Sequence, residues 1–319
     1  MSQSKIWKSL TGEELERVIK KHFGAGKIEY RLLPGGMFNT TYLVNLVSRN
    51  RKIVLRAGPV NRELLLPFEH QLMQAEFSFY ENCRRVGVPV PRVAACDTGK
   101  SLLDRDYMIT EYIEAVPLSD ESVSDEEKEA LYEEAGSFAA RINGIPGTVF
   151  GRVGDAASGK GFSAWSAFLR EEVSQWAGKA AEFQVFPESE LEKVQAVFRT
   201  YTEILDEIHE PKLVHADLWA GNILVSGTSG RRRLAAVIDG DRAIWGDRDF
   251  ELASGWLVNP AFLKGYGEIS VPDEHALLRK KLYMLLYHVI DSYVWQVEYD
   301  NMENSLSEKE KVRQLLAEL

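Results

Sequence analysis

The sequence predicts an α+β protein with two lobes, a small strand-rich lobe followed by a larger, mainly helical one. Residues 28–57 contain three apolar segments separated by a glycine turn and a polar turn, which is typical of an antiparallel meander. Residues 124–208 instead contain three long segments with helical periodicity. The composition changes near residue 110, so we expect lobes formed by residues 1–110 and 111–319.

The elements of the first lobe follow from local signals. Residues 11–23 begin with a threonine cap and acidic residues and place apolar residues on one face, which predicts an amphipathic helix. Residues 65–87 form a second helix that the prolines of "VPVPRV" end. Alternation and β-branching in residues 106–113 predict a further strand.

The second lobe is helical on both sides of a hairpin. Helices are expected at residues 124–143, 162–180 and 188–208. A hairpin then joins "NILV" to "RLAAVID" through the turn "SGTSG", and the pattern is helical again from residue 273.

The charge distribution limits the class of partner. The chain of 319 residues carries a net charge of −10, which argues against binding to nucleic acid. The basic run 231–233 is interpreted as the solvated edge of the hairpin. Residues 1–110 carry a net charge of +6 and residues 111–319 a net charge of −16. An anion could therefore bind in the N-terminal part of the chain and a cation in the C-terminal part.

Membrane, disulfide and zinc functions are not indicated. No apolar run reaches the roughly 18 residues that a membrane helix needs, and the N-terminus is too polar for a secretory signal. Cys83 and Cys96 stand in unrelated contexts without metal-site spacing. We therefore expect a cytoplasmic protein without a membrane partner, and the choice between monomer and homodimer stays open.

The stretch "LVHADLWAGNILV" (213–225) is either a polar turn between buried strands or a catalytic loop. Asp217 and Asn222 have the spacing of the kinase catalytic loop, in which the Asp orients the attacking hydroxyl and the Asn holds a metal. Asp239 ends an apolar strand 17 residues after Asn222. A two-stranded hairpin fits in this length and would bring Asp239 back beside Asn222. Asn222 and Asp239 are therefore expected to share a Mg²⁺ site, with His215 as a scaffold for the loop.

A glycine turn and a cation precede this loop. Gly35 and Gly36 lie between strands, where backbone N–H groups could face phosphate oxygens, although such a pair alone is more often a plain hairpin turn. Arg56 lies within an apolar strand about twenty residues later, and Glu76 on the next helix could pair with it.

Together these motifs, which span residues 32–253, resemble the aminoglycoside phosphotransferase or choline-kinase-like small-molecule kinases, which share the bilobal protein-kinase-like fold. The resemblance also covers "VPVPRV", "MITEYI" and "VIDGDRAIWGDRDFELA". It implies ATP or GTP as the phosphoryl donor and Mg²⁺ as cofactor. Where the family usually has Lys, His and "GDP", this chain has Arg56, Asn143 and "GDR".

Roles are carried over to the matching positions. Asp217 would be the catalytic base, and Asn222 and Asp239 would bind Mg²⁺. The resemblance assigns nucleotide binding to Gly35, Gly36, Asn39, Arg56 and Glu76, and contact with the nucleobase to Glu111, Tyr112 and Ile113. Asp247 and Glu251 would anchor loops.

The expected activity is transfer of the γ-phosphoryl group to a hydroxyl of a small molecule. A protein substrate is disfavoured because the segment from Asp239 to Glu251 is short and because Trp219 replaces the basic residue common two positions after the catalytic Asp. An inactive nucleotide-binding pseudokinase is the remote alternative, although Asp217, Asn222 and Asp239 are all present.

The acidic second lobe favours a cationic acceptor such as an aminoglycoside or another amino sugar or amine. The resemblance would associate such an activity with antibiotic resistance, and a role in biosynthesis or metabolism stays open. A metabolite kinase of the choline, homoserine, fructosamine or methylthioribose type, or a macrolide phosphotransferase, stays open. Candidate acceptor residues are Asp241, Asp291 and Glu298; a spacing of seven would place the last two on one helix face. Three tryptophans would either stack on the acceptor or belong to the core: Trp245, Trp256 and Trp295.

Overall fold

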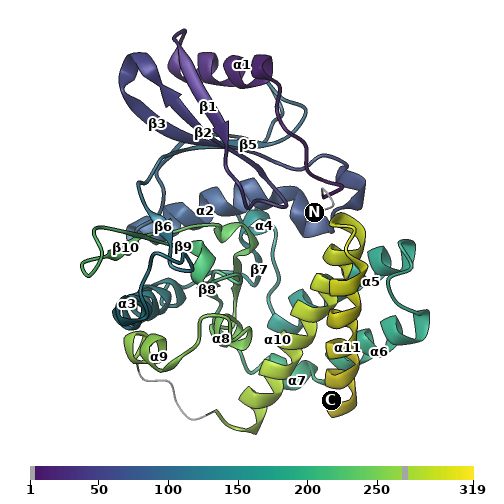
Figure 1. Ribbon diagram of the computed structural model, residues 1–319. Coiled ribbons are helices and arrows are strands. Elements are labelled where there is room, and N and C mark those ends of the chain that lie inside the picture. Colours follow the sequence, from purple (N-terminus) through teal and green to yellow (C-terminus); the bar gives the residue numbers. More distant parts are fainter. Residues whose placement is uncertain (1–3, 268–271) are drawn as a thin grey trace.

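The computed structural model describes residues 4–267 and 272–319, and its elements form two lobes joined beside helix α2 (Figure 1). The strands are β1 (Ile28–Leu32), β2 (Thr40–Leu46), β3 (Arg51–Ala57), β4 (Val93–Asp97), β5 (Tyr107–Glu111), β6 (Val116–Pro117), β7 (Gly151–Arg152), β8 (Lys212–Val214), β9 (Ile223–Ser226), β10 (Arg233–Val237) and β11 (Ile244–Gly246). The helices are α1 (Gly12–Phe23), α2 (Leu72–Arg85), α3 (Asp125–Asn143), α4 (Val153–Ala157), α5 (Trp165–Glu182), α6 (Glu188–Thr200), α7 (Thr202–Leu205), α8 (Asp249–Ala253), α9 (Pro260–Tyr266), α10 (Glu274–Tyr293) and α11 (Met302–Glu318).

The first lobe is a five-stranded antiparallel sheet in the order β1-β2-β3-β5-β4, with α1 on one side. Burial alternates along β2, as the expected meander requires. Thr11 and Glu14 form a capping box that starts α1, whose apolar face joins the core of this lobe. In this register Arg56 on β3 lies opposite Thr41 and Met108.

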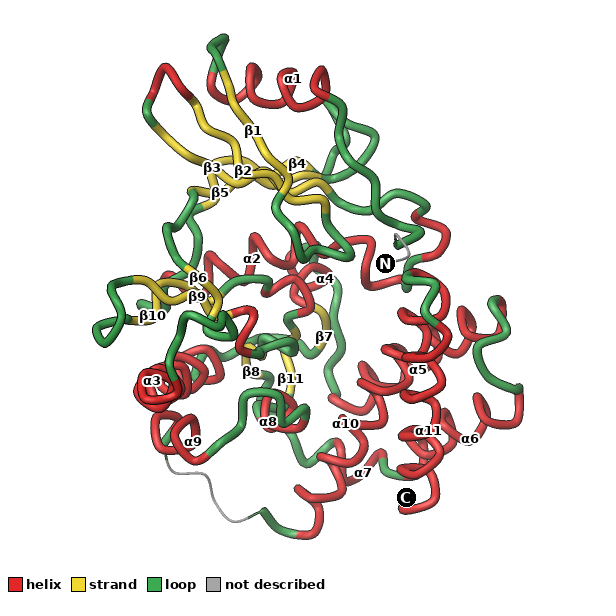
Figure 2. Tube along the Cα trace, viewed as in Figure 1, coloured by secondary structure: helices red, strands yellow, loops and turns green. Residues whose placement is uncertain are grey.

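The chain leaves the sheet after Glu111, so the boundary predicted at residue 110 falls inside β5. It then forms the short strand β6, which pairs with β9 of the second lobe. Figure 2 shows this change from strands to a mainly helical region.

The second lobe contains two small sheets, β10-β9-β6 and β7-β11-β8, surrounded by helices. Its largest core cluster includes the buried side chains of Trp165 and Trp176 on α5 and of Tyr283 on α10. The hairpin of β9 and β10 and the long helices α3, α5 and α10 confirm the predictions. The single helix predicted over residues 188–208 is instead divided into α6 and α7 at Tyr201.

The interpretation of residues 231–233 as a solvated edge is wrong for Arg232. Its Nη1 donates to Glu127 Oε2 at 2.9 Å and to the Ser122 carbonyl at 2.5 Å, and only 12% of its side chain is exposed. The tertiary fold brings the start of α3 against the hairpin, so this arginine fixes the hairpin to α3.

Within the described part of the chain, no helix is both long and apolar enough to cross a membrane. Both cysteines are free thiols; Cys83 is buried and Cys96 is half-buried.

Candidate active site

The loop between β8 and β9 positions Asp217 through Asn222. The Asn222 side-chain amide donates to the backbone carbonyl of Asp217 at 2.8 Å and to its Oδ2 at 3.1 Å. Asn222 Oδ1 accepts no hydrogen bond from the described residues, so it is available as a ligand. A single amide thus orients the carboxylate and still offers an oxygen to a cation.

His215 supports the loop from behind. It is fully buried, its Nε2 donates to the Ile238 carbonyl at 2.9 Å, and its Nδ1 accepts from the Asp217 N–H at 3.3 Å. Burial lowers the pKa of His215 to about 4, so the ring is neutral at physiological pH. The Glu251 carboxylate accepts the His215 N–H at 2.7 Å, a contact that anchors the loop.

Two residues of the site have left-handed backbone conformations that are uncommon outside glycine. Ala216 has φ 63° and Asp239 has φ 64°. The Tyr287 hydroxyl donates to the Ala216 carbonyl at 3.0 Å and so ties the loop to α10. Tyr287 carries no motif, and we did not predict its role from the sequence.

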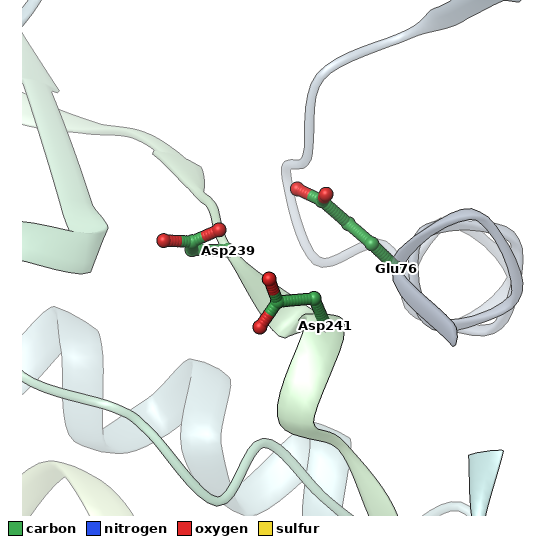
Figure 3. Close-up of side chains that lie close together, drawn as sticks. All are labelled: Glu76, Asp239 and Asp241. Atoms are coloured by element: carbon green, nitrogen blue, oxygen red, sulfur yellow. The ribbon is translucent and has the colours of Figure 1, made fainter. Parts of the chain in front are cut away.

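The hairpin returns the chain to the loop as predicted. The N–H of Ile238, the residue before Asp239, donates to the Asn222 carbonyl at 2.9 Å. Figure 3 shows Glu76 projecting from α2 toward the turn that carries Asp239 and Asp241, and ligand atoms of these three carboxyl groups all lie within 4.8 Å of one another. The sequence predicted that Asp239 lies at this position, but not that the carboxyl groups of Glu76 and Asp241 lie beside it.

Arg56 reaches into this cluster from β3. Its Nη1 pairs with Glu76, and its Nη2 lies 2.5 Å from Asp239 Oδ1 and 4.0 Å from Asp241 Oδ2. Burial opposes the charge of Arg56, but Glu76 and Asp239 outweigh it and raise its pKa above the ordinary value. Arg56 therefore stays cationic.

The single positive charge of Arg56 does not balance the negative charges that Glu76, Asp239 and Asp241 would carry if all three were ionised. Burial and the neighbouring Asp239 raise the pKa of Asp241 well above its ordinary range. A divalent cation would relieve this repulsion, and the oxygen donors of Asp239 and Asn222 are of the kind that Mg²⁺ prefers. The residues present therefore fit a magnesium ion.

The acceptor role predicted for Asp241 requires correction. Its side chain is 10% exposed and lies 4.0 Å from Arg56, so it belongs to the carboxylate cluster with Glu76 and Asp239. The cause is the tight turn after Asp239, which places ligand atoms of both carboxyl groups within 4.8 Å of one from Glu76 on α2.

The acceptor role predicted for Glu298 is also wrong. The helix changes at Val294–Glu298 into a π-helical turn, which removes the seven-residue register with Asp291. Glu298 is fully buried, and within residues 4–267 and 272–319 neither carboxyl oxygen has a hydrogen-bond partner. Burial and the nearby Glu69 raise its pKa well above the ordinary value, so burial favours its neutral form.

Asp291 differs from both. It is half-buried on α10, and burial raises its pKa to about 6, while Arg242 opposes the shift. No ion pair or side-chain hydrogen bond joins its carboxylate to any residue that the structure describes.

The glycine turn has the geometry that close backbone approach requires. Gly35 has φ 105°, which favours glycine. A Cβ on Gly36 would lie 2.6 Å from the carbonyl oxygen of Asn39, a buried residue, so no larger residue fits without movement. The turn is thus specific for glycine at both positions.

At the expected nucleobase contact, two of the three side chains contact residues of β3. Glu111 Oε1 lies 2.8 Å from Arg51 Nη2, and Lys52 Nζ lies 5.5 Å from the centroid of the Tyr112 ring. The N–H of Ile113 donates to no acceptor among the described residues. It remains available to a ligand.

The tryptophans divide between surface and packing roles. Trp219, two residues after Asp217, is 45% exposed, and Trp256 is 47% exposed and lies edge-on to Tyr287 at 5.3 Å. Trp245 instead packs against Gly147, where a Cβ would lie 2.7 Å from the indole. Trp295 lies edge-on to Tyr299 at 5.4 Å.

Asp217 is suited to act as a base near neutral pH. Burial raises its pKa to about 7, and Arg242 is the main group that lowers it. Arg242 Nη2 donates to Glu69 Oε1 at 3.3 Å. The sequence signalled Arg242 only through the "GDR" departure, and we assigned it no role there.

Comparison with known proteins identifies the family of this chain. Residues 29–278 match the phosphotransferase enzyme family, APH. A Vibrio vulnificus protein assigned as a ketoamine kinase is 29% identical over 135 residues, 40% of this chain and 42% of that protein. The match to this curated relative therefore spans about two fifths of its length.

Two solved structures share the fold. A Thermobifida fusca protein assigned as a fructosamine-3-kinase has a TM-score of 0.68 at 18% identity, covering 95% of this chain and 98% of that one. APH(2")-IIa, solved with streptomycin and ATP, has a TM-score of 0.63 at 17% identity, covering 97% of each chain. The protein therefore belongs to the APH phosphotransferase enzyme family and has the protein-kinase-like fold of these structures.

Proposed function

We propose that the protein transfers the γ-phosphoryl group of ATP or GTP to a hydroxyl of an amino-sugar acceptor. Ketoamines, which are ketoses carrying an amine, are the first acceptor class to test, and aminoglycosides are the second. The observation that carries this proposal is the arrangement of Asp217, Asn222 and Asp239, in which one amide joins the base to the metal side.

Each residue has a distinct task in this proposal. Asp217 accepts the proton of the attacking hydroxyl, and Asn222 holds its carboxylate in place. Asn222 Oδ1 and Asp239 hold Mg²⁺, which when bound neutralises charge on the phosphate oxygens. Arg56 pairs with both Glu76 of α2 and Asp239. It thereby holds the two lobes in a fixed position relative to each other where the phosphates bind.

The nucleotide is placed between the glycine turn and the segment after β5. The exposed backbone at Gly35 and Gly36 suits phosphate oxygens, and the unpaired N–H of Ile113 suits an acceptor atom of a nucleobase. The ATP in the APH(2")-IIa complex supports a nucleoside triphosphate donor in this fold.

Two observations support an amino-sugar acceptor. Trp219 presents a half-exposed indole two residues from the proposed base, a surface on which a sugar ring can stack. Residues 111–319 carry −16, which attracts cationic ligands. The ketoamine kinase match favours ketoamines, and the streptomycin complex of APH(2")-IIa favours aminoglycosides as the second candidate.

A nucleotide-turnover screen tests the proposal. Wild type and Asp217→Ala are compared with ATP or GTP and Mg²⁺ on ketoamines, aminoglycosides, choline, homoserine and neutral sugars. Acceptor-dependent turnover should appear with an amino sugar and fall by about 10²- to 10⁴-fold in Asp217→Ala. Nucleotide binding should persist in the variant. Equal rates in both proteins would refute the assignment and leave the pseudokinase alternative.

A further inference from the structure

We propose that Tyr80 on α2 is a positioning residue, whose hydroxyl fixes the backbone at Asp239 and thereby the carboxylate that would hold Mg²⁺. This inference rests on the proposed function, in which Asp239 is a metal ligand, and it assigns that ligand a supporting residue. Tyr80 stands in no motif of the sequence, and we predicted no role for it there.

The Tyr80 hydroxyl makes two hydrogen bonds from a fully buried side chain. It donates to Glu76 Oε1, one helical turn earlier on α2, and it accepts the Asp239 N–H at 3.2 Å. Glu76 belongs to α2, whereas Asp239 follows β10 of the second lobe. A single hydroxyl therefore joins α2 to the turn that carries the proposed metal ligand.

The chemistry of a hydroxyl suits this place. A carboxylate can only accept a hydrogen bond and a backbone N–H can only donate one, whereas a hydroxyl does both. Burial and the neighbouring Glu76 raise the pKa of Tyr80 well above its ordinary value, so the hydroxyl keeps its proton. The direction of both hydrogen bonds is thus determined.

Asp239 needs such support because its backbone conformation is unfavourable. Its φ of 64° lies in the left-handed region, which residues other than glycine seldom adopt. Among the residues that the structure describes, its N–H has no acceptor other than the Tyr80 hydroxyl. A rotation of this backbone would carry the Asp239 carboxylate with it, so the hydrogen bond also fixes where the carboxylate lies.

The apolar neighbour of Tyr80 fixes the same turn by packing. A Cβ on Gly240 would overlap the ring of Phe79, so α2 and the turn approach as closely as a glycine allows. The Phe79 ring also lies edge-on to His215, the scaffold of the catalytic loop, at 5.1 Å. Because this packing does not involve the Tyr80 hydroxyl, the polar contribution of Tyr80 can be removed by itself.

Loss of the hydroxyl should affect Asp239 more than Glu76. Both carboxyl oxygens of Glu76 also accept from Arg56 Nη1, so Glu76 keeps a partner. The Asp239 N–H would instead be left buried without an acceptor, which is unfavourable enough to change the local backbone. The expected defect is therefore in the use of Mg²⁺ and not in the pairing of Arg56.

Tyr80→Phe tests this role because it removes only the hydroxyl. Titration with a fluorescent ATP analogue measures the Kd with and without Mg²⁺, and the ratio of the two values is the factor by which Mg²⁺ tightens binding. This factor should fall by about tenfold in Tyr80→Phe, as is typical when a group that orients a metal ligand is lost. The Kd without Mg²⁺ should change by less than about twofold.

Tyr42→Phe is the matched control. The buried Tyr42 hydroxyl also accepts a backbone N–H, that of Leu10 at 2.7 Å, but Tyr42 belongs to the core of the first lobe. Its loss should leave the Mg²⁺ factor unchanged. An unchanged factor in Tyr80→Phe, or an equal fall in Tyr42→Phe, would overturn the inference.

The double variant with Asp239→Ala shows whether Tyr80 acts through Asp239. When the Asp239 carboxylate is absent, Tyr80→Phe should lower the Mg²⁺ factor no further, and a further fall would contradict the inference. A normal Mg²⁺ factor in Asp239→Ala alone would refute the metal role of the proposed function and this inference with it. A loss in Asp239→Ala without a loss in Tyr80→Phe overturns only the inference.

Hydrogen exchange of wild type keeps the inference testable if Tyr80→Phe is too unstable to assay. The Asp239 amide, followed by NMR, should exchange far more slowly than an amide in an unstructured peptide, because the Tyr80 hydroxyl accepts its hydrogen. Exchange at the rate of an unstructured peptide would show that this hydrogen bond does not form in solution and would overturn the inference.

Discussion

The side-chain amide of Asn222 donates to both the backbone carbonyl and the carboxylate of Asp217, at 2.8 and 3.1 Å. The amide nitrogen is thereby directed to Asp217 and the amide oxygen away from it. The residue expected to hold the metal and the residue expected to take the proton are therefore mechanically coupled, and a change at Asn222 should affect both.

Asn222→Ala should weaken activation by Mg²⁺ by about 10- to 100-fold and also lower kcat, because it removes both an oxygen ligand and the orientation of Asp217. Asn222→Asp keeps an oxygen ligand but not the donor, so it should recover part of the Mg²⁺ dependence and little of kcat. Titration of initial rates with Mg²⁺ measures both effects. Recovery of full kcat in Asn222→Asp would show that the hydrogen bonds to Asp217 are unimportant.

The pH profile should have an acidic limb near pH 7. Burial raises the pKa of Asp217 to about 7, and its carboxylate is the active form, so kcat/KM should fall about tenfold per unit below this pH and level off above it. The pKa of His215 is about 4, so His215 contributes nothing in this range.

A control variant at Glu251 is needed to assign the acidic limb to Asp217, because burial also raises the pKa of Glu251 to about 7. Glu251→Gln keeps an acceptor for the His215 N–H and should retain the acidic limb. Rates from pH 5.5 to 8.5 provide the test; a profile that is flat below pH 7 would exclude Asp217 as the base.

Arg56→Met should destabilise the protein by about 3–5 kcal/mol, because it leaves three carboxyl groups without their cation. Arg56→Lys should destabilise it less and should raise KM for the nucleotide, since one ammonium cannot bridge Glu76 and Asp239 as two guanidinium nitrogens do. Urea unfolding measures the free energies. Arg31→Met, at an exposed arginine of β1, is the matched control and should cost under about 0.5 kcal/mol.

Gly36→Ala should raise KM for the nucleotide, because the new Cβ would lie 2.6 Å from the Asn39 carbonyl and would distort the turn. Gly178→Ala on α5 has no atom within 4 Å of its Cβ. It should leave kinetics unchanged and stabilise the helix by up to about 1 kcal/mol. Steady-state kinetics and thermal unfolding of both variants separate the effects, and an unchanged nucleotide KM in Gly36→Ala would argue against phosphate binding by this turn.

The sequence by itself determined the local elements and the spacing of the central motif. Alternation along Thr40–Leu46 and the cap at Thr11 are local signals, because each depends on residues only a few positions apart. Asp217, Asn222 and Asp239 could be placed together because a hairpin of known length connects two of them. The membership of the family followed from the same short motifs.

The tertiary structure decided which side chains of similar chemistry share a site. Glu298 and Asp291 look equivalent in the sequence, yet Glu298 in the π-helical turn is fully buried, whereas Asp291 on α10 is half-buried. The neighbours of Arg56 lie 20 and 183 positions away, so their contacts depend on how the two lobes pack. Local periodicity carries no information about such distant pairs, because burial and charge at each position are set by the elements that pack against it.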